Sequence, residues 1–208
     1  MRSLVVAIFA TLGFTTGFSQ VFWTETFSNQ ASSTTNWVSG GTNAGPEVWT
    51  WSNDPLAGFV GTNIPAFAAP TAADGYFYFN SDANGEFDHA VTLSNTGAPA
   101  NCTGKTGVRL HFQTQYIKYT ATAVAEVGVS TDGGATYTYH SLFPTLGISV
   151  IYQDEVVVDI PEADNAAAVV LQFRWTGNYE YHWKVDDIAL EEYVAPANAI
   201  TFRVNSSL

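Results

Sequence analysis

Carboxylates near both ends of the chain occur where side chains are expected to be buried. Glu25 shares a predicted strand face with Trp23, and Asp187 alternates with apolar residues within residues 183–188. A buried carboxylate loses its hydration and therefore needs a partner group or a metal ion, and calcium prefers oxygen ligands of this kind. We predict that Glu25 and one of Asp186 and Asp187 bind a structural calcium ion, which requires the first and last strands to be neighbours. The alternative is a carboxylate that accepts hydrogen bonds from backbone amides.

A second set of oxygen-bearing side chains lies within residues 80–88. Asn80, Asp82 and Asn84 alternate there, and Gly85 permits a sharp turn. This spacing could direct several oxygens to one calcium ion. The same residue types are also typical of an ordinary polar turn between two strands. Calcium ligation by these three side chains and a purely structural turn are therefore the two interpretations.

Polar side chains suited to a neutral ligand occur on two predicted strands. Arg109, His111 and Gln113 alternate with apolar residues, and so do Gln172 and Arg174. If the two strands are neighbours, these five side chains form one sheet face that could hydrogen-bond sugar hydroxyls beside a stacking Tyr or Trp. The solvated face of any antiparallel sheet gives the same pattern.

Catalytic motifs are missing from the sequence. It has no His-x-x-x-His pair, no Gly-x-Ser-x-Gly motif and no complete phosphate-binding loop ending in Gly-Lys-Ser/Thr. Glu25 and Asp187 could form the acid pair of a glycosidase, but almost any β protein offers two acids. Cys102 lies in a turn-like stretch without the setting that a nucleophile requires. The chain is therefore predicted not to be an enzyme.

The elements that must position these residues are predicted to be strands. No segment has a sustained helical period, whereas short alternating runs recur between Gly, Asn, Pro and Ser clusters, which is typical of an all-β sandwich. Asp132 and Gly133 mark a tight hairpin because they tolerate a positive φ. The connections 28–47 and 53–73 are expected to be loops. The expected strands are residues 21–27, 48–51, 75–80, 89–93, 108–119, 123–130, 135–142, 152–160, 168–176 and 181–190.

The N-terminus has the pattern of a secretory signal peptide. Arg2 precedes an apolar run, and Gly17 and Ser19 form a small-x-small pattern suited to cleavage before Gln20. The apolar run is shorter than the ~20 residues that span a bilayer, and no later stretch is long enough. We expect residues 1–19 to be a signal peptide and residues 20–192 to be the sandwich. Residues 193–208 are expected to be a linker that leads into a further strand of this domain or the start of a following β domain.

The charge balance limits the possible partners. The chain has 19 acidic residues against 7 Lys and Arg, a net charge of −12. This charge repels nucleic acids and anionic membranes, so neither partner is expected. Cations, neutral glycans and basic protein patches remain compatible. A single cysteine excludes an intrachain disulfide, which makes calcium a natural stabiliser outside the cell.

Four segments carry a family resemblance. They are residues 24–27 (TETF), 74–81 (DGYFYFNS), 129–134 (VSTDGG) and 183–188 (WKVDDI). In this order and spacing they resemble the jelly-roll modules of secreted Bacteroidetes proteins, which are related to cleaved-adhesin and MAM-like domains. The resemblance spans most of residues 21–192. It implies a two-sheet antiparallel β-sandwich of jelly-roll type, frequent calcium binding, and a role in adhesion or as an accessory module of a surface protein.

The combined expectation is a secreted or cell-surface binding module that is stabilised by calcium and recognises an extracellular glycan or protein. One alternative is a non-catalytic accessory domain of a multidomain extracellular hydrolase. Another is a structural spacer between adhesive domains.

Overall fold

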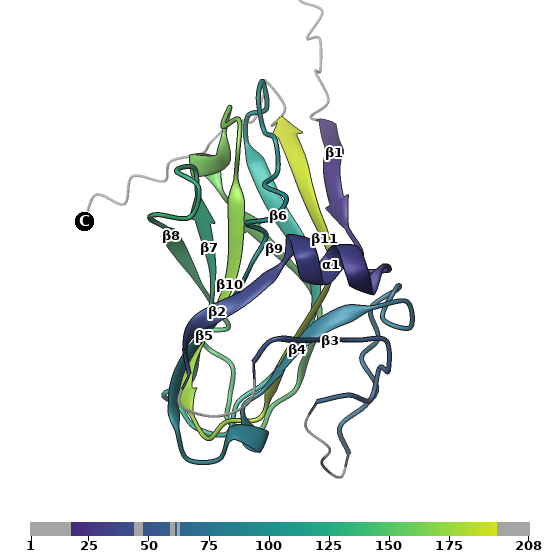
Figure 1. Ribbon diagram of the computed structural model, residues 1–208, viewed down its shortest axis with the longest axis vertical. Helices are drawn as coiled ribbons and strands as arrows, with labels where there is room; N and C mark the ends of the chain where they lie inside the picture. The colour runs from purple at the N-terminus through teal and green to yellow at the C-terminus, as the bar shows by residue number, and fades with distance from the viewer. Residues whose placement is uncertain (1–17, 44–47, 59–60, 62, 195–208) are drawn as a thin grey trace, which may run out of the picture.

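Two antiparallel sheets packed face to face form the protein (Figure 1). The computed structural model describes residues 18–43, 48–58, 61 and 63–194. The predicted all-β, two-sheet antiparallel sandwich is confirmed. The predicted signal peptide, apart from Phe18 and Ser19, lies outside the described residues, as do residues 195–208.

The first sheet contains six strands and the second contains five. The order of the first sheet is β3 (Thr50–Ser52), β4 (Tyr76–Asn80), β11 (His182–Val194), β6 (Val108–Ile117) and β9 (Tyr152–Asp159), and β1 (Phe18–Glu25) also pairs with β11. The order of the second sheet is β2 (Val38–Asn43), β5 (Asp88–Ser94), β10 (Val170–Asn178), β7 (Val124–Ser130) and β8 (Thr138–Leu142). Each of the ten expected strands overlaps one of these observed strands.

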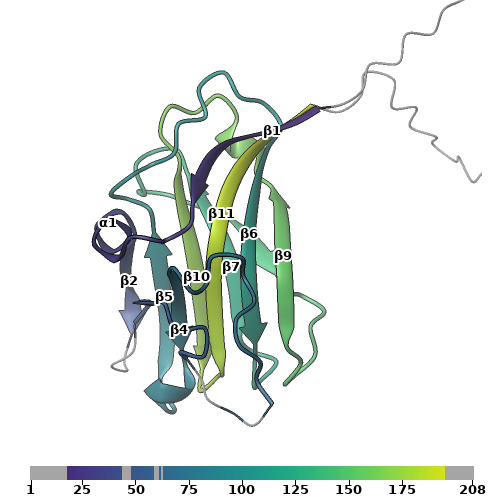
Figure 2. The ribbon, with the colours of Figure 1, turned by 90° about the vertical axis from the view of Figure 1, so that its right-hand side faces the viewer.

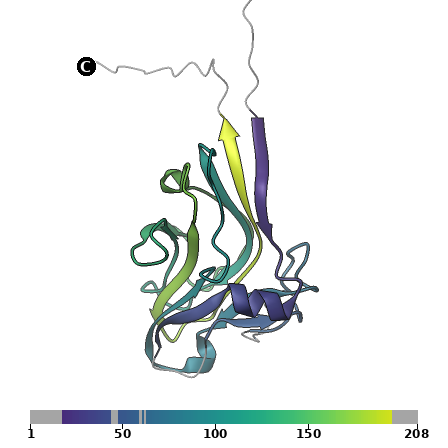
Figure 3. The same cartoon turned by 45° about the horizontal axis from the view of Figure 1, so that its top comes forward.

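The chain crosses repeatedly from one sheet to the other. From β4 to β11 it alternates between the sheets at every step except the β7–β8 hairpin, which is the wrapping of a jelly roll. β1 and β11, the first and last strands, pair antiparallel, and Phe18 lies opposite Val194 (Figure 3). The neighbouring terminal strands that the predicted calcium site requires are therefore present.

Alternate side chains of both sheets meet in an aromatic core. Leu110 and Phe112 point inward from β6, while Phe173 and Trp175 point inward from β10, and all four are fully buried. The Phe112 and Phe173 rings lie 5.0 Å apart edge to face. Because strand side chains alternate between faces, the polar residues between them point out of the sandwich.

The connection between β1 and β3 differs from its predicted form, a loop. It contains helix α1 (Gln30–Asn36), which begins where the side chain of Asn29 accepts a hydrogen bond from the Ser32 amide at 3.1 Å, and strand β2. α1 is polar, with Ser33 as its buried residue, so it has no hydrophobic period that would reveal it. Trp37 directly follows α1 and is buried in the core, which ties this segment to the sandwich.

The long connection between β3 and β4 covers part of the outer face of the first sheet (Figure 2). Phe67 and Ala72 from this connection pack with Tyr76 of β4 in a second apolar cluster. The Tyr76 hydroxyl donates to the Asp54 carbonyl at 2.7 Å, and the Lys184 ammonium donates to the Pro55 carbonyl at 3.1 Å. The connection therefore buries side chains of β11 that an uncovered sheet would expose.

Candidate functional site

Glu25, Asp186 and Asp187 come together at the point where β1 ends beside β11. The β1–β11 pairing places Glu25 opposite Ile188. Asp186 is completely buried, whereas Glu25 and Asp187 are partly exposed. The predicted proximity of these acids is thus present in the structure.

Thr71, in the long β3–β4 connection, holds both aspartates. Its hydroxyl lies 2.8 Å from Asp187 Oδ1 and 3.1 Å from Asp186 Oδ2, and its amide donates to Asp187 Oδ2 at 3.3 Å. The Asp187 amide donates to Asp186 Oδ1 at 2.7 Å. Glu25 accepts a hydrogen bond from the Phe27 amide at 2.8 Å. The predicted alternative, carboxylates bound to backbone amides, therefore describes part of the cluster.

The electrostatics of Asp186 are unfavourable for a charged group. Burial, followed by the nearby charge of Asp187, raises the pKa of Asp186 to about 8, and Glu25 adds a smaller effect in the same direction. Among the described residues, no ion pair joins Asp186 or Asp187 to a lysine, arginine or histidine. A cation is the partner that would favour ionisation of this cluster.

The donors of this cluster suit calcium in kind. All of them are oxygens: three carboxylates, the Thr71 hydroxyl and the Thr26 carbonyl, which lies 3.5 Å from that hydroxyl. Within the described residues, however, no three His, Cys, Asp or Glu side chains converge closely enough to hold a metal by themselves. Calcium readily takes carbonyl, hydroxyl and water oxygens as well, so Glu25, Asp186, Asp187, Thr71 and the Thr26 carbonyl are the groups that would hold it.

One detail of the prediction is wrong. Strict alternation places Asp187 on the buried face with Trp183 and Val185, but a β-bulge interrupts the register between Asp186 and Ala189. Asp187 has a φ of +47° there. The bulge returns Ile188 to the core, leaves Asp187 partly exposed and makes Asp186 the buried carboxylate.

Residues 80–88 form a compact turn between β4 and β5. Asn80 ends β4, and Asp82 and Asn84 belong to a short 3-10 helix (Asp82–Asn84). The Asn80 side chain accepts a hydrogen bond from the Ala83 amide at 3.4 Å. This bond fits a structural turn, and calcium ligation by Asn80, Asp82 and Asn84 stays a prediction.

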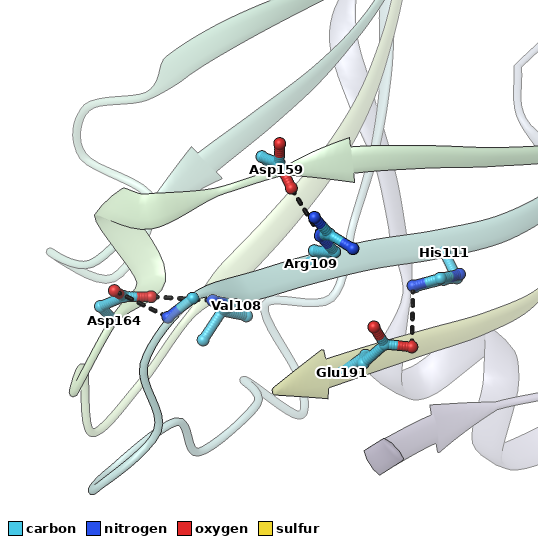
Figure 4. A network of polar contacts seen from close by, with 7 residues as sticks. Val108, Arg109, His111, Asp159, Asp164 and Glu191 are labelled. Carbon is cyan, nitrogen blue, oxygen red and sulfur yellow. Dashed lines mark hydrogen bonds and ion pairs between the residues drawn. The ribbon is translucent and has the colours of Figure 1, made fainter. Parts of the chain in front are cut away.

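The outer face of the first sheet carries three of the five predicted ligand-binding residues, two of which are drawn in Figure 4. Arg109 donates to Asp159 at 2.7 Å, and its guanidinium lies 3.6 Å above the Tyr193 ring centre. His111 lies 3.3 Å from Glu191 and 3.2 Å from Glu155. Gln113 is the next outward residue on β6, so this face is an acidic surface with two basic groups.

The second sheet carries the other two predicted residues, Gln172 and Arg174. Arg174 donates to Glu126 at 2.8 Å, and its guanidinium lies 3.5 Å above the Tyr139 ring centre. The Tyr139 hydroxyl donates to Gln172 at 2.8 Å, and the Tyr137 ring lies nearly parallel to that of Tyr139 at 5.8 Å. Gln172 itself is buried and also donates to the Ser94 hydroxyl at 3.0 Å. The partly exposed groups of this face are therefore Arg174, Tyr137 and Tyr139.

A single face for these five residues required β6 and β10 to be neighbours, and this condition is not met. β6 belongs to the first sheet and β10 to the second, with the core between them. Arg109, His111 and Gln113 therefore lie on one side of the sandwich, and Gln172 and Arg174 lie on the other. Their roles in ligand binding stay predictions for two separate surfaces.

Sequence reasoning missed Thr71 and Tyr139 as site residues. Thr71 lies 116 residues before Asp187, and nothing in its local sequence marks it. Tyr139 follows Tyr137 at strand spacing in a predicted strand, which was a usable indication that two rings share one sheet face.

Comparisons with known proteins extend the fold description. No protein-family model and no curated protein matches the sequence. The K1 cleaved-adhesin domain of Lys-gingipain from Porphyromonas gingivalis W83 matches with a TM-score of 0.52 and 18% identity, covering 85% of this chain and 98% of that domain. TmCBM61, solved with β-1,4-galactotriose, matches with a TM-score of 0.44 and 15% identity over 77% of this chain and 91% of its own. The xylan-binding module CBM15 matches with a TM-score of 0.45 and 7% identity, covering 85% of this chain and 97% of its own. At 18% identity, the likeness to the K1 domain shows a similar fold and nothing more. Separately, the described residues contain no helix that is long and apolar enough to cross a membrane.

Proposed function

We propose that this protein is a non-enzymatic binding module, secreted or held at the cell surface, which recognises an extracellular glycan or protein. The observation that carries the proposal is the surface around Tyr139 on the second sheet. There a guanidinium and two stacked tyrosine rings are held by a cation–π contact, ring stacking and a hydrogen bond to the buried Gln172 amide. Fixed planar groups lose little entropy when a ligand binds.

The backbone beneath these rings supports this role. Gly128 lies under them, and a Cβ there would approach the Tyr139 ring to 2.7 Å and the Tyr137 ring to 3.0 Å. The missing side chain lets both rings lie close to the sheet. Rings in this position offer apolar surface to a ligand, and the hydrogen bond from the Tyr139 hydroxyl to Gln172 holds one of them in place. The fold likeness to a cleaved-adhesin domain also supports a binding role.

The titratable groups support the non-enzymatic part of the proposal. Burial raises the pKa of the Cys102 thiol to about 11, so the nucleophilic thiolate is scarce at neutral pH. Burial lowers the pKa of His182 to about 3, and its Nε2 is hydrogen-bonded to Gln115 at 2.9 Å. Neither group suits catalysis near neutral pH.

We also propose that calcium stabilises the module at the Asp186 cluster. The ion would supply the positive charge that the two adjacent aspartates lack. It would tie β1, β11 and the Thr71 connection together. The signal-like N-terminus supports export to a compartment where calcium is plentiful.

Thermal unfolding with calcium and with a chelator tests the calcium proposal. We expect bound calcium in the purified protein and a lower Tm after chelation in the wild type. The Asp186→Asn variant should show no such response. A wild-type Tm that chelation leaves unchanged, together with no calcium in the protein, would refute this part.

Binding to arrayed glycans and extracellular proteins tests the main proposal, with Arg174→Ala and Arg109→Ala as a matched pair. The two side chains are 30% and 29% exposed, and each stacks on a tyrosine and pairs with an acid. We expect Arg174→Ala to weaken binding and Arg109→Ala to leave it unchanged. If Arg109→Ala weakened binding and Arg174→Ala did not, the ligand would bind to the first sheet instead. A folded wild type that binds nothing would overturn the proposal.

A further inference from the structure

Three loops meet at the end of the sandwich opposite the described chain termini, the lower end in Figure 2. They join β4 to β5, β6 to β7, and β10 to β11. β11 runs from this end to Val194, a distance of roughly 40 Å for 13 residues. The loops therefore point away from both termini, which leaves this end accessible when the module is tethered through either one.

A hollow of about 300 Å³ opens between these loops. Its lining consists of Asp82, Tyr119, Tyr179, Glu180 and Tyr181. Tyr119 is 48% exposed and Tyr179 is 38% exposed, an unusual degree for two large rings in adjacent loops. The volume lies at the lower end of the range for small-ligand sites.

The backbone at Tyr179 is strained. Its φ is +51°, in the left-handed region that glycine adopts freely and bulky residues avoid. Such strain is energetically unfavourable and concentrates at functional sites. A ring at this position therefore needs a reason beyond the turn itself, because glycine would form the turn at lower cost.

Glu180 fixes the three loops relative to one another. Its side chain is buried, and its carboxylate accepts hydrogen bonds from the Tyr119 amide at 2.6 Å and the Thr120 amide at 2.8 Å. Its amide donates to Ser81 at 2.9 Å. The rings are thus presented by a rigid support, as a binding site requires.

The chemistry of the hollow favours a neutral, hydroxyl-rich ligand. Tyr119 contacts Tyr179 and Tyr181 edge to face at 6.0 and 5.5 Å, and Tyr119 and Tyr179 each present exposed ring surface to the solvent. The C–H face of a sugar stacks on such rings. The Asp82 carboxylate at the rim can accept hydrogen bonds from sugar hydroxyls, and its negative charge repels acidic sugars.

We propose that this hollow is a second binding site that takes the end of a neutral glycan chain, with one sugar ring against Tyr119 and Tyr179. The inference rests on the proposed binding function and gives the glycan a site separate from the Tyr139 surface. It also assigns a role to the strained residue, because the left-handed turn aims the Tyr179 ring at the hollow.

An array of neutral oligosaccharides, probed with the folded protein in calcium, tests the inference. Tyr179→Gly removes the ring but relieves the backbone strain, so its Tm should equal or exceed that of the wild type. We expect Tyr179→Gly and Tyr119→Ala to lose about tenfold or more of the affinity for the oligosaccharide that the wild type binds. Tyr193→Ala is the matched control, because it removes a partly exposed tyrosine ring at the opposite end of β11, far from the hollow. It should retain binding to that oligosaccharide.

A second measurement needs no variant. The bound oligosaccharide should protect Tyr119 and Tyr179 of the wild type from nitration, detected by mass spectrometry, while Tyr139 stays reactive. Glycan binding that survives both hollow variants would overturn this inference and leave the proposed function intact. Preference for a cationic ligand or a protein over every neutral glycan would overturn it too, and a wild type that binds neither glycan nor protein would overturn both.

Discussion

Asp132 and Asp186 are both aspartates that accept hydrogen bonds from hydroxyl groups, yet the pKa values of their carboxyl groups are shifted in opposite directions. Asp132 lies in the exposed β7–β8 hairpin, where hydrogen bonds from the Thr136 hydroxyl and amide and from Ser130 hold its pKa well below the usual range. Asp186 lies under the β3–β4 connection, where burial and then Asp187 raise its pKa to about 8.

The two aspartates differ in how far along the chain their hydrogen-bond partners lie. The partners of Asp132 lie within four residues of it, so the hairpin satisfies its own carboxylate. The hydroxyl that binds Asp186 comes from a residue 115 positions away, and the fold adds burial and a second negative charge. The first carboxylate stabilises local structure as an anion, whereas burial and a neighbouring negative charge disfavour the anionic form of the second.

The largest expected effect is a loss of stability at Asp186 as the pH rises in the metal-free protein. The folded pKa of about 8 exceeds the ordinary value of 3.8, so the folded state holds a proton that the unfolded state has released. Stability from this group is therefore present below about pH 4 and is lost as the pH rises to about 8. The loss should be on the order of several kcal/mol.

Denaturant unfolding of wild type and Asp186→Asn in chelator, at pH 5 and pH 8, measures this effect. The comparison with the variant is needed because the lowered pKa of buried His182 acts in the opposite sense below pH 6.5. The free energy of unfolding of the variant should rise relative to that of the wild type as the pH rises. Calcium should remove this relative gain in stability. Equal pH dependence in the two proteins would contradict the assignment.

A smaller effect is expected from Thr71→Val. The substitution keeps the shape of the side chain but removes the hydroxyl that lies 2.8 and 3.1 Å from the two aspartates. Loss of a hydrogen-bond partner for the carboxyl groups of the buried Asp186 and the partly exposed Asp187 should cost about 1–3 kcal/mol in the free energy of unfolding. Thr24→Val, at an exposed position on β1, is the matched control. Equal effects of the two substitutions would show that the Thr71 hydroxyl does not hold the cluster.

The smallest effect is expected from Asp132→Ala in the hairpin. Because the folded pKa of Asp132 is lowered, the stability from its ionised form is present above about pH 4 and is lost as the pH falls. The variant should have a slightly lower Tm at pH 7, a difference that shrinks in acid and does not respond to calcium. Thr131→Ala in the same turn is the control, and a calcium-dependent change in Asp132→Ala would break the contrast with Asp186.

Sequence periodicity predicted the ten strands because inward and outward side chains alternate along each of them. It missed α1 and β2, whose residues are too polar or too rich in glycine for a periodic pattern. It also left open whether β6 and β10 share one face, since alternation shows that a side chain points outward but not from which sheet. The acids of the calcium prediction were found because a carboxylate among apolar residues is conspicuous in any sequence.

The sequence by itself determined the β-sandwich class, the Asp132 hairpin and the identity of the acids near the two chain ends, because alternation, turn residues and buried charge act over a few neighbouring positions. The tertiary structure alone decided that Arg109 and Arg174 face opposite sides, that the bulge buries Asp186 instead of Asp187, and that Tyr119 meets Tyr179. These outcomes depend on strand order and on contacts between residues far apart in the chain, which local patterns do not specify.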